Sequence, residues 1–153
     1  MPLETAQAAE ESKPSVYVET TIISYLTARP SRDLVMAAHQ QITHEWWATR
    51  RKDFDLFVSR AVIQEAGIGE TEMAEKRLQA IETFPRLDVS PEADDLAELF
   101  VKRGSLPQKA AVDAVHIAVA TVHKMDYLLT WNCKHIANVE IYRKVAAICR
   151  EKG

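Results

Sequence analysis

Short apolar runs alternate along this chain with longer segments in which apolar residues recur every three or four positions. Runs rich in Val, Ile, Leu and aromatic residues are typical of buried strands, and the longer period is typical of helices packed on one side. The pattern predicts strands at residues 15–18, 53–59, 85–90 and 125–130, and a short edge strand at 139–142. It predicts helices within residues 20–28 and at 34–51, 60–66, 70–83, 91–103, 110–122 and 143–150, with a helical turn at 134–137.

This alternation, with connections long enough to cross over a sheet, predicts an α/β fold with a mainly parallel central sheet. Helices on both faces would make it a three-layer α/β/α sandwich. The length of 153 residues is that of one domain with one core. We place the domain at residues 15–150 and expect the polar residues 1–14 to form a mobile lead-in.

One acidic residue, Asp113, lies in the apolar segment 110–122 among Ala, Val and Ile. The segment has no Gly, Pro, Lys or Arg, so it predicts a helix buried among other elements. An ionised carboxylate withdrawn from water is costly unless a cation or a metal ion compensates it. We therefore expect the fold to bring a compensating group to Asp113.

Other polar residues are expected at one rim of the sheet, because ligands of parallel sheets bind outside the carboxyl ends of the strands. Glu19 follows the first strand, Glu65 lies about one and a half helical turns beyond the second, and Asn132 follows the fourth. Carboxylates gathered without basic partners repel one another unless they share a cation. Oxygen ligands suit Mg²⁺ or Mn²⁺, so the sequence predicts a metal site able to activate water against a phosphodiester.

Composition narrows the class of protein. The chain is 47% hydrophobic and 27% charged, which are globular proportions, and no apolar run approaches the roughly 20 residues that span a bilayer. No secretory signal is visible near the start, so we expect a cytoplasmic protein without a membrane partner. Cys133 and Cys149 form no CxxC motif and are expected to be free thiols. The net charge of −3 argues against sequence-blind clamping of duplex nucleic acid.

Four blocks of sequence, in order, resemble the pattern of PIN-domain proteins, especially the toxin ribonucleases of bacterial type II toxin–antitoxin systems. The blocks are residues 16–21 (VYVETT), 59–66 (SRAVIQEA), 112–118 (VDAVHIA) and 128–136 (LLTWNCKHI). The resemblance covers about residues 15–142. It implies a PIN-like sandwich that cuts RNA with Mg²⁺ or Mn²⁺, leaving a 3′-hydroxyl and a 5′-phosphate.

The resemblance also places the family's four functional positions on Glu19, Glu65, Asp113 and Asn132. The first three would bind the metal, and a metal-activated water would attack the RNA. The first position is commonly Asp, and the fourth is commonly acidic, so Glu19 and Asn132 depart from the pattern. Asn132 can still offer a carbonyl oxygen or orient a water. The implied partners are an RNA substrate, a protein antitoxin that covers the acidic rim, and a second copy of the chain in a homodimer.

Each of these residues also has a purely structural interpretation. Glu19 would then be an exposed residue at a strand end, Glu65 a solvated helix acid, and Asn132 a cap for the turn that follows it. Asp113 would have a hydrogen-bonded structural role. His116 lies one turn from Asp113 on the same face, and we interpret it as a satisfied core histidine or a support for a metal ligand rather than a general base.

The main hypothesis is therefore a metal-dependent endoribonuclease. The alternative is a catalytically weakened or inactive PIN-like module that binds RNA or protein, because two positions depart from the family pattern. In either case residues 131–135 could seat RNA by stacking and charge. An unrelated phosphohydrolase would need an Asp nucleophile after the first strand, and Glu19 fits that role poorly.

Overall fold

The first strand forms the centre of a four-stranded, entirely parallel sheet. The computed structural model describes residues 12–153, and residues 1–11 lie outside that description. The strand order is β3-β2-β1-β4, and Tyr17 of β1 is in register with Phe57 of β2 and Leu128 of β4. The strands are β1 (Ser15–Val18), β2 (Asp55–Ser59), β3 (Arg86–Leu87) and β4 (Tyr127–Leu129). All their carboxyl ends therefore lie at one edge of the sheet.

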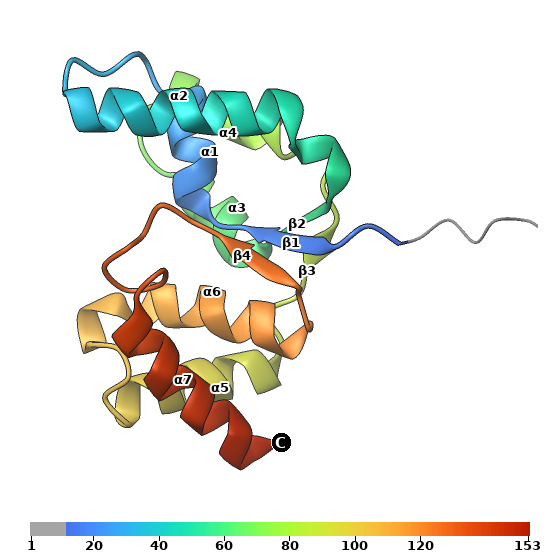
Figure 1. Ribbon diagram of the computed structural model, residues 1–153, viewed down its shortest axis with the longest axis vertical. Coiled ribbons are helices and arrows are strands. Elements are labelled where there is room, and N and C mark those ends of the chain that lie inside the picture. Colours follow the sequence, from blue (N-terminus) through green and yellow to red (C-terminus); the bar gives the residue numbers. More distant parts are fainter. Residues whose placement is uncertain (1–11) are drawn as a thin grey trace, which may run out of the picture.

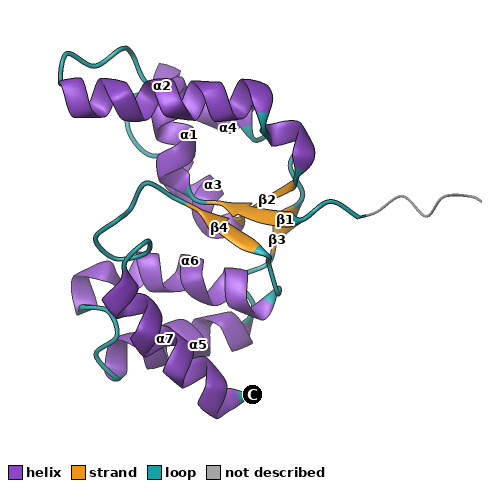
Figure 2. Cartoon of the chain, viewed as in Figure 1, coloured by secondary structure: helices purple, strands orange, loops and turns teal. Residues whose placement is uncertain are grey.

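Helices cover both faces of this sheet (Figure 1, Figure 2). One layer contains α1 (Thr20–Thr27), α2 (Leu34–Thr49) and α4 (Thr71–Ala80). The opposite layer contains α5 (Pro91–Lys102), α6 (Ala111–Val122) and α7 (Val139–Lys152). The remaining helical segments are α3 (Arg60–Ala66), which follows β2 directly, and the 3₁₀ turns η1 (Arg51–Asp53) and η2 (Gln108–Ala110). The predicted three-layer α/β/α class is confirmed.

The core holds α6 firmly between the sheet and α5. Ala93 and Ala97 on α5, and Ala114 and Ala118 on α6, are buried and repeat at a spacing of four residues. Small side chains at this spacing form one helix face each, so the two backbones can pack closely. On the other side of α6 the sheet contributes fully buried residues such as Tyr17. The side chains of α6 that face the carboxyl edge of the sheet are therefore held in fixed positions.

The predicted edge strand at residues 139–142 is wrong, because this segment is the first turn of α7. Asn138 caps the helix, and its Oδ1 accepts from the backbone N–H groups of Glu140 and Ile141 at 3.0 and 3.3 Å. Ile141, Val145 and Ile148 are the buried residues of α7, and this spacing is that of a helix face. The alternation of Val139 and Ile141 resembled a strand only because the window was short. The third strand is also shorter than predicted, with two residues.

Two further predictions concern the N-terminal residues and the two cysteines. The lead-in predicted for residues 1–14 falls mainly on residues 1–11, which lie outside the described part. Cys133 and Cys149 are free thiols, as predicted. Within residues 12–153, no helix combines the length and the apolar character needed to cross a bilayer.

Candidate active site

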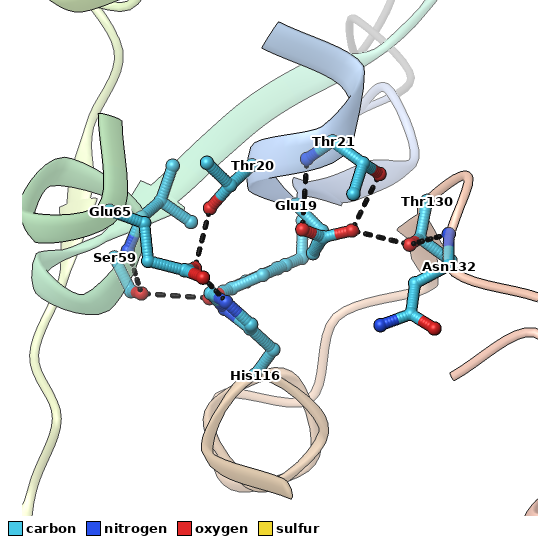
Figure 3. A network of polar contacts seen from close by, with 10 residues as sticks. Glu19, Thr20, Thr21, Ser59, Glu65, His116, Thr130 and Asn132 are labelled. Carbon is cyan, nitrogen blue, oxygen red and sulfur yellow. Dashed lines mark hydrogen bonds and ion pairs between the residues drawn. The ribbon is translucent and has the colours of Figure 1, made fainter. Parts of the chain in front are cut away.

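Glu19 sits where the chain leaves β1 and enters α1, and its side chain is buried (Figure 3). Its Oε2 accepts from the backbone N–H of Thr21 at 2.9 Å, which makes Glu19 the N-cap of α1. Its Oε1 accepts from the hydroxyls of Thr21 and Thr130 at 2.7 and 2.5 Å. The exposed fraction of Glu19 is 3%, so the interpretation as an exposed strand-end residue is wrong. Neutral donors and the positive end of α1 stabilise this carboxylate.

Glu65 approaches the same point from α3, the helix that follows β2. Its Oε1 accepts from the Thr20 hydroxyl at 2.7 Å and from His116 Nε2 at 2.5 Å. Burial by itself would raise the pKa of Glu65. The hydrogen bond and charge of His116, together with the Thr20 hydrogen bond, outweigh burial and hold that pKa below its usual range. Glu65 is therefore ionised at neutral pH.

The buried hydroxyl groups of Tyr17 and Ser59 form a hydrogen-bonded chain that ends on His116. Tyr17 Oη lies 2.6 Å from His116 Nδ1 and 2.7 Å from Ser59 Oγ. All three side chains are at most 1% exposed. Burial, reinforced by the negative charges of Glu19 and Glu65, raises the pKa of Tyr17 far above its usual range, so the phenol keeps its proton. Both ring nitrogens of His116 are thus engaged, one by the Tyr17 hydroxyl and the other by a carboxylate.

Asp113 lies in the first turn of α6, where it is half-buried rather than enclosed by apolar neighbours. Its side chain is 22% exposed, and its Oδ2 accepts from His135 Nδ1 at 3.0 Å. The compensating group expected for this carboxylate is therefore His135, with the helix N-terminus as a second source of positive potential. This pairing was not predicted, although His135 lies within residues 128–136, the last of the four blocks.

Asn132 closes the turn between β4 and α7. Its Oδ1 accepts from the His135 backbone N–H at 3.0 Å, and its own N–H donates to the Thr130 hydroxyl at 2.9 Å. Its carbonyl oxygen accepts from Ile136 and Ala137. The turn-capping interpretation of Asn132 thus has direct geometric support. By holding the turn, Asn132 also fixes His135 beside Asp113.

The structure brings Glu19, Glu65 and His116 together, since each offers a ligand atom within 4.8 Å of the others. Among residues 12–153, Asp113 is not a member of this group. The partners of the two carboxylates are threonines and a histidine, and no described Lys or Arg forms an ion pair with them. The two carboxylates are oxygen ligands of the kind that Mg²⁺ and Mn²⁺ bind. The donation of hydrogen bonds to these carboxylates by Thr20, Thr21 and Thr130 was not predicted.

Thr130→Val is expected to destabilise the fold by about 1–3 kcal/mol, because it removes one donor from a buried carboxylate oxygen and the acceptor of the Asn132 N–H. The measurement is the free energy of unfolding in urea. Thr121→Val is the matched control, since the exposed Thr121 hydroxyl bonds only the Ile117 carbonyl of its own helix. The control should change stability by less than about 0.5 kcal/mol. Equal effects of the two variants would show that the bond to Glu19 contributes nothing.

Comparisons with known proteins give one informative result. No protein-family model matches the chain, and the comparison with curated proteins gives no match. Among solved structures, the chain is similar to VapC20 of Mycobacterium tuberculosis, described as a sarcin-ricin loop cleaving toxin. The TM-score is 0.60 and the sequence identity is 16%, over 78% of this chain and 92% of VapC20. At this identity the similarity concerns the fold, and it confirms the PIN-like architecture expected from the four sequence blocks.

Proposed function

We propose that this chain, which has the fold of a PIN-domain toxin, is a metal-dependent endoribonuclease that hydrolyses RNA phosphodiester bonds. The observation that carries the proposal is the convergence of two carboxylates from distant segments. Glu19 and Glu65 meet at the carboxyl edge of the sheet, within 4.8 Å of each other and of His116. Such a pair is stable when it shares a cation.

Glu19, Glu65 and Asp113 are the proposed ligands of Mg²⁺ or Mn²⁺. Asp113 accepts from His135 through Oδ2, and a carboxylate with one such bond keeps acceptor capacity on its other oxygen. When bound, a divalent ion polarises a phosphate oxygen and lowers the pKa of a bound water. In this arrangement the threonines orient Glu19 and Glu65, and His135 orients Asp113. We propose that Asn132 holds the turn that carries His135. We also propose that it contributes to catalysis by positioning a water molecule.

A second candidate function has its own supporting observation. His116 already compensates Glu65, and the Oδ1 atom of Asn132 is occupied by a backbone N–H. A site that satisfies its own charges in this way would also suit an inactive PIN-like module that binds RNA or protein. The two candidate functions predict different effects of a divalent ion on RNA cleavage and on the melting temperature.

Addition of Mn²⁺ to metal-stripped protein is expected to start cleavage of single-stranded RNA and to raise the melting temperature. An ion at about 100 times its Kd stabilises the native state by about 2.7 kcal/mol. For a chain of this size that corresponds to roughly 5–10 °C. Calorimetry with and without excess EDTA measures the shift, and gel analysis of labelled RNA measures the cleavage. An inactive binding module would retain RNA while showing neither effect.

The proposed biological role is that of the toxin in a cytoplasmic toxin–antitoxin pair, with an antitoxin over the acidic rim. This proposal rests on the similarity of the fold to VapC20, which is a toxin, and on the resemblance of the four blocks. We also propose a homodimer through α2, which carries a group of exposed apolar side chains. Its members, between 47% and 86% exposed, are Leu34, Val35, Met36 and Ile42.

Val35→Glu is expected to convert the proposed dimer to a monomer, because it places a charge in an apolar contact. Light scattering after size-exclusion chromatography gives the mass of both proteins. Val139→Glu is the matched control, since Val139 is equally exposed on α7, at 66% against 64%. A monomeric parent protein, or an equal effect of the control, would exclude α2 as the dimer interface.

A further inference from the structure

His116 is buried, yet its Nε2 atom faces the two carboxylates of the candidate site. It lies on α6, one turn beyond Asp113, with 1% of its surface exposed. Its Nε2 meets Glu65 Oε1 at 2.5 Å, and the ligand atoms of Glu19, Glu65 and His116 all lie within 4.8 Å of one another. A core histidine that only filled space would not need to direct a nitrogen at an acidic pair.

The hydroxyl groups of Tyr17 and Ser59 can form a hydrogen-bonded chain to His116 in either of its neutral tautomers. In one arrangement Ser59 donates to Tyr17, Tyr17 donates to Nδ1, and Nε2–H donates to Glu65. In the other, Nδ1–H donates to Tyr17, Tyr17 donates to Ser59, and the Nε2 lone pair faces the site. Each hydrogen bond of the chain exists in both arrangements, with its direction reversed along Ser59, Tyr17 and Nδ1. The change of tautomer gives up the hydrogen bond from Nε2 to Glu65 and leaves the Nε2 lone pair free for a metal ion bound between them.

We propose that His116 Nε2 is a direct ligand of the divalent ion that Glu19 and Glu65 bind, and that Tyr17 and Ser59 are its positioning residues. This inference rests on the proposed metal-dependent function. A histidine that ligates a metal characteristically has its other ring nitrogen hydrogen-bonded to a fixed partner, which selects the tautomer and the ring orientation. Tyr17 Oη, at 2.6 Å from Nδ1, is such a partner.

The chemical consequence is a preference among metal ions. Mg²⁺ takes oxygen ligands almost exclusively, whereas first-row transition ions accept imidazole nitrogen readily. A site with two carboxylates and one imidazole therefore binds Mn²⁺ more tightly than Mg²⁺. Loss of the nitrogen should lower Mn²⁺ affinity much more than Mg²⁺ affinity.

The test uses the full chain, stripped of metal and loaded with MnCl₂. Pulsed electron paramagnetic resonance detects the coupling of Mn²⁺ to a directly bound ¹⁴N nucleus. We expect this coupling in the parent protein and in His135→Gln, the control at the other histidine beside the carboxylates. We expect it to vanish in His116→Gln. Titration calorimetry should give at least about a tenfold loss of Mn²⁺ affinity for His116→Gln, and about 10- to 100-fold for Tyr17→Phe, which removes only the supporting hydroxyl.

If His116→Gln does not fold, the nitrogen coupling measured in the parent protein and in the other two variants still tests the proposal. Tyr17→Phe and His135→Gln leave His116 in place. Persistence of the nitrogen coupling of bound Mn²⁺ in both variants, with weaker Mn²⁺ binding in Tyr17→Phe than in the parent protein, supports the proposal. Bound Mn²⁺ without nitrogen coupling, or coupling lost in His135→Gln, overturns it. Mn²⁺-dependent RNA cleavage without nitrogen coupling would overturn this inference and leave the proposed ribonuclease intact. Absence of both Mn²⁺ binding and cleavage would overturn both.

Discussion

Glu65→Gln is expected to lower metal-dependent RNA cleavage by about 10³-fold while the protein remains folded. The amide keeps the volume of the carboxylate and can still accept from Thr20, but it removes the negative charge that would hold the ion. Stabilisation of transition-state charge by a metal is worth several kcal/mol, and each 1.36 kcal/mol corresponds to a tenfold change in rate. The measurement is the initial rate of RNA cleavage in Mn²⁺, with circular dichroism as the test of folding.

The control for this variant is Glu72→Gln. Glu72 is an exposed helix acid that pairs with Lys76 four residues later, so its substitution makes the same chemical change far from the candidate site. Its cleavage rate should equal that of the parent. If Glu65→Gln cleaved RNA as fast as Glu72→Gln, Glu65 would have no part in catalysis and the proposed metal site would be excluded.

Asp113→Asn is expected to lower cleavage by about 100-fold or more, again with the fold retained. Asp113 is half-buried and sits at the start of α6, where the isosteric amide can still accept from His135 through its oxygen. The variant therefore removes charge and little else, and the loss should show in the cleavage rate and in Mn²⁺ affinity. The melting temperature without metal should change little.

Asp94→Asn is the matched control, because Asp94 is also a first-turn acid, in the neighbouring helix α5. Asp113 lies outside the group formed by Glu19, Glu65 and His116, so this pair of variants tests its assignment directly. Equal cleavage by Asp113→Asn and Asp94→Asn would assign the Asp113–His135 contact a structural role only.

The helix predicted at residues 110–122 shows which features of the site the local sequence pattern can predict. The apolar sequence predicted the helix, and its buried residues include Ala114, Ala118 and Val119. The inference that Asp113 shares this burial was too strong, because its side chain is 22% exposed while the neighbouring Ala114 is fully buried. The group that compensates Asp113 comes from a turn 22 residues later in the chain. No periodicity within the helix contains that information.

The alternation of strands and helices predicted an α/β/α sandwich and placed Glu19 and Glu65 at the carboxyl edge of the sheet, because hydrophobic period is a local property of the chain. The resemblance of the four ordered blocks implied that this sandwich is PIN-like. Only the tertiary structure decided that Glu19 is buried and held by Thr130, that His116 joins the two carboxylates, and that residues 139–142 begin a helix. Those outcomes depend on contacts between segments up to 111 residues apart, and such contacts are set by how the layers pack rather than by the sequence near each residue.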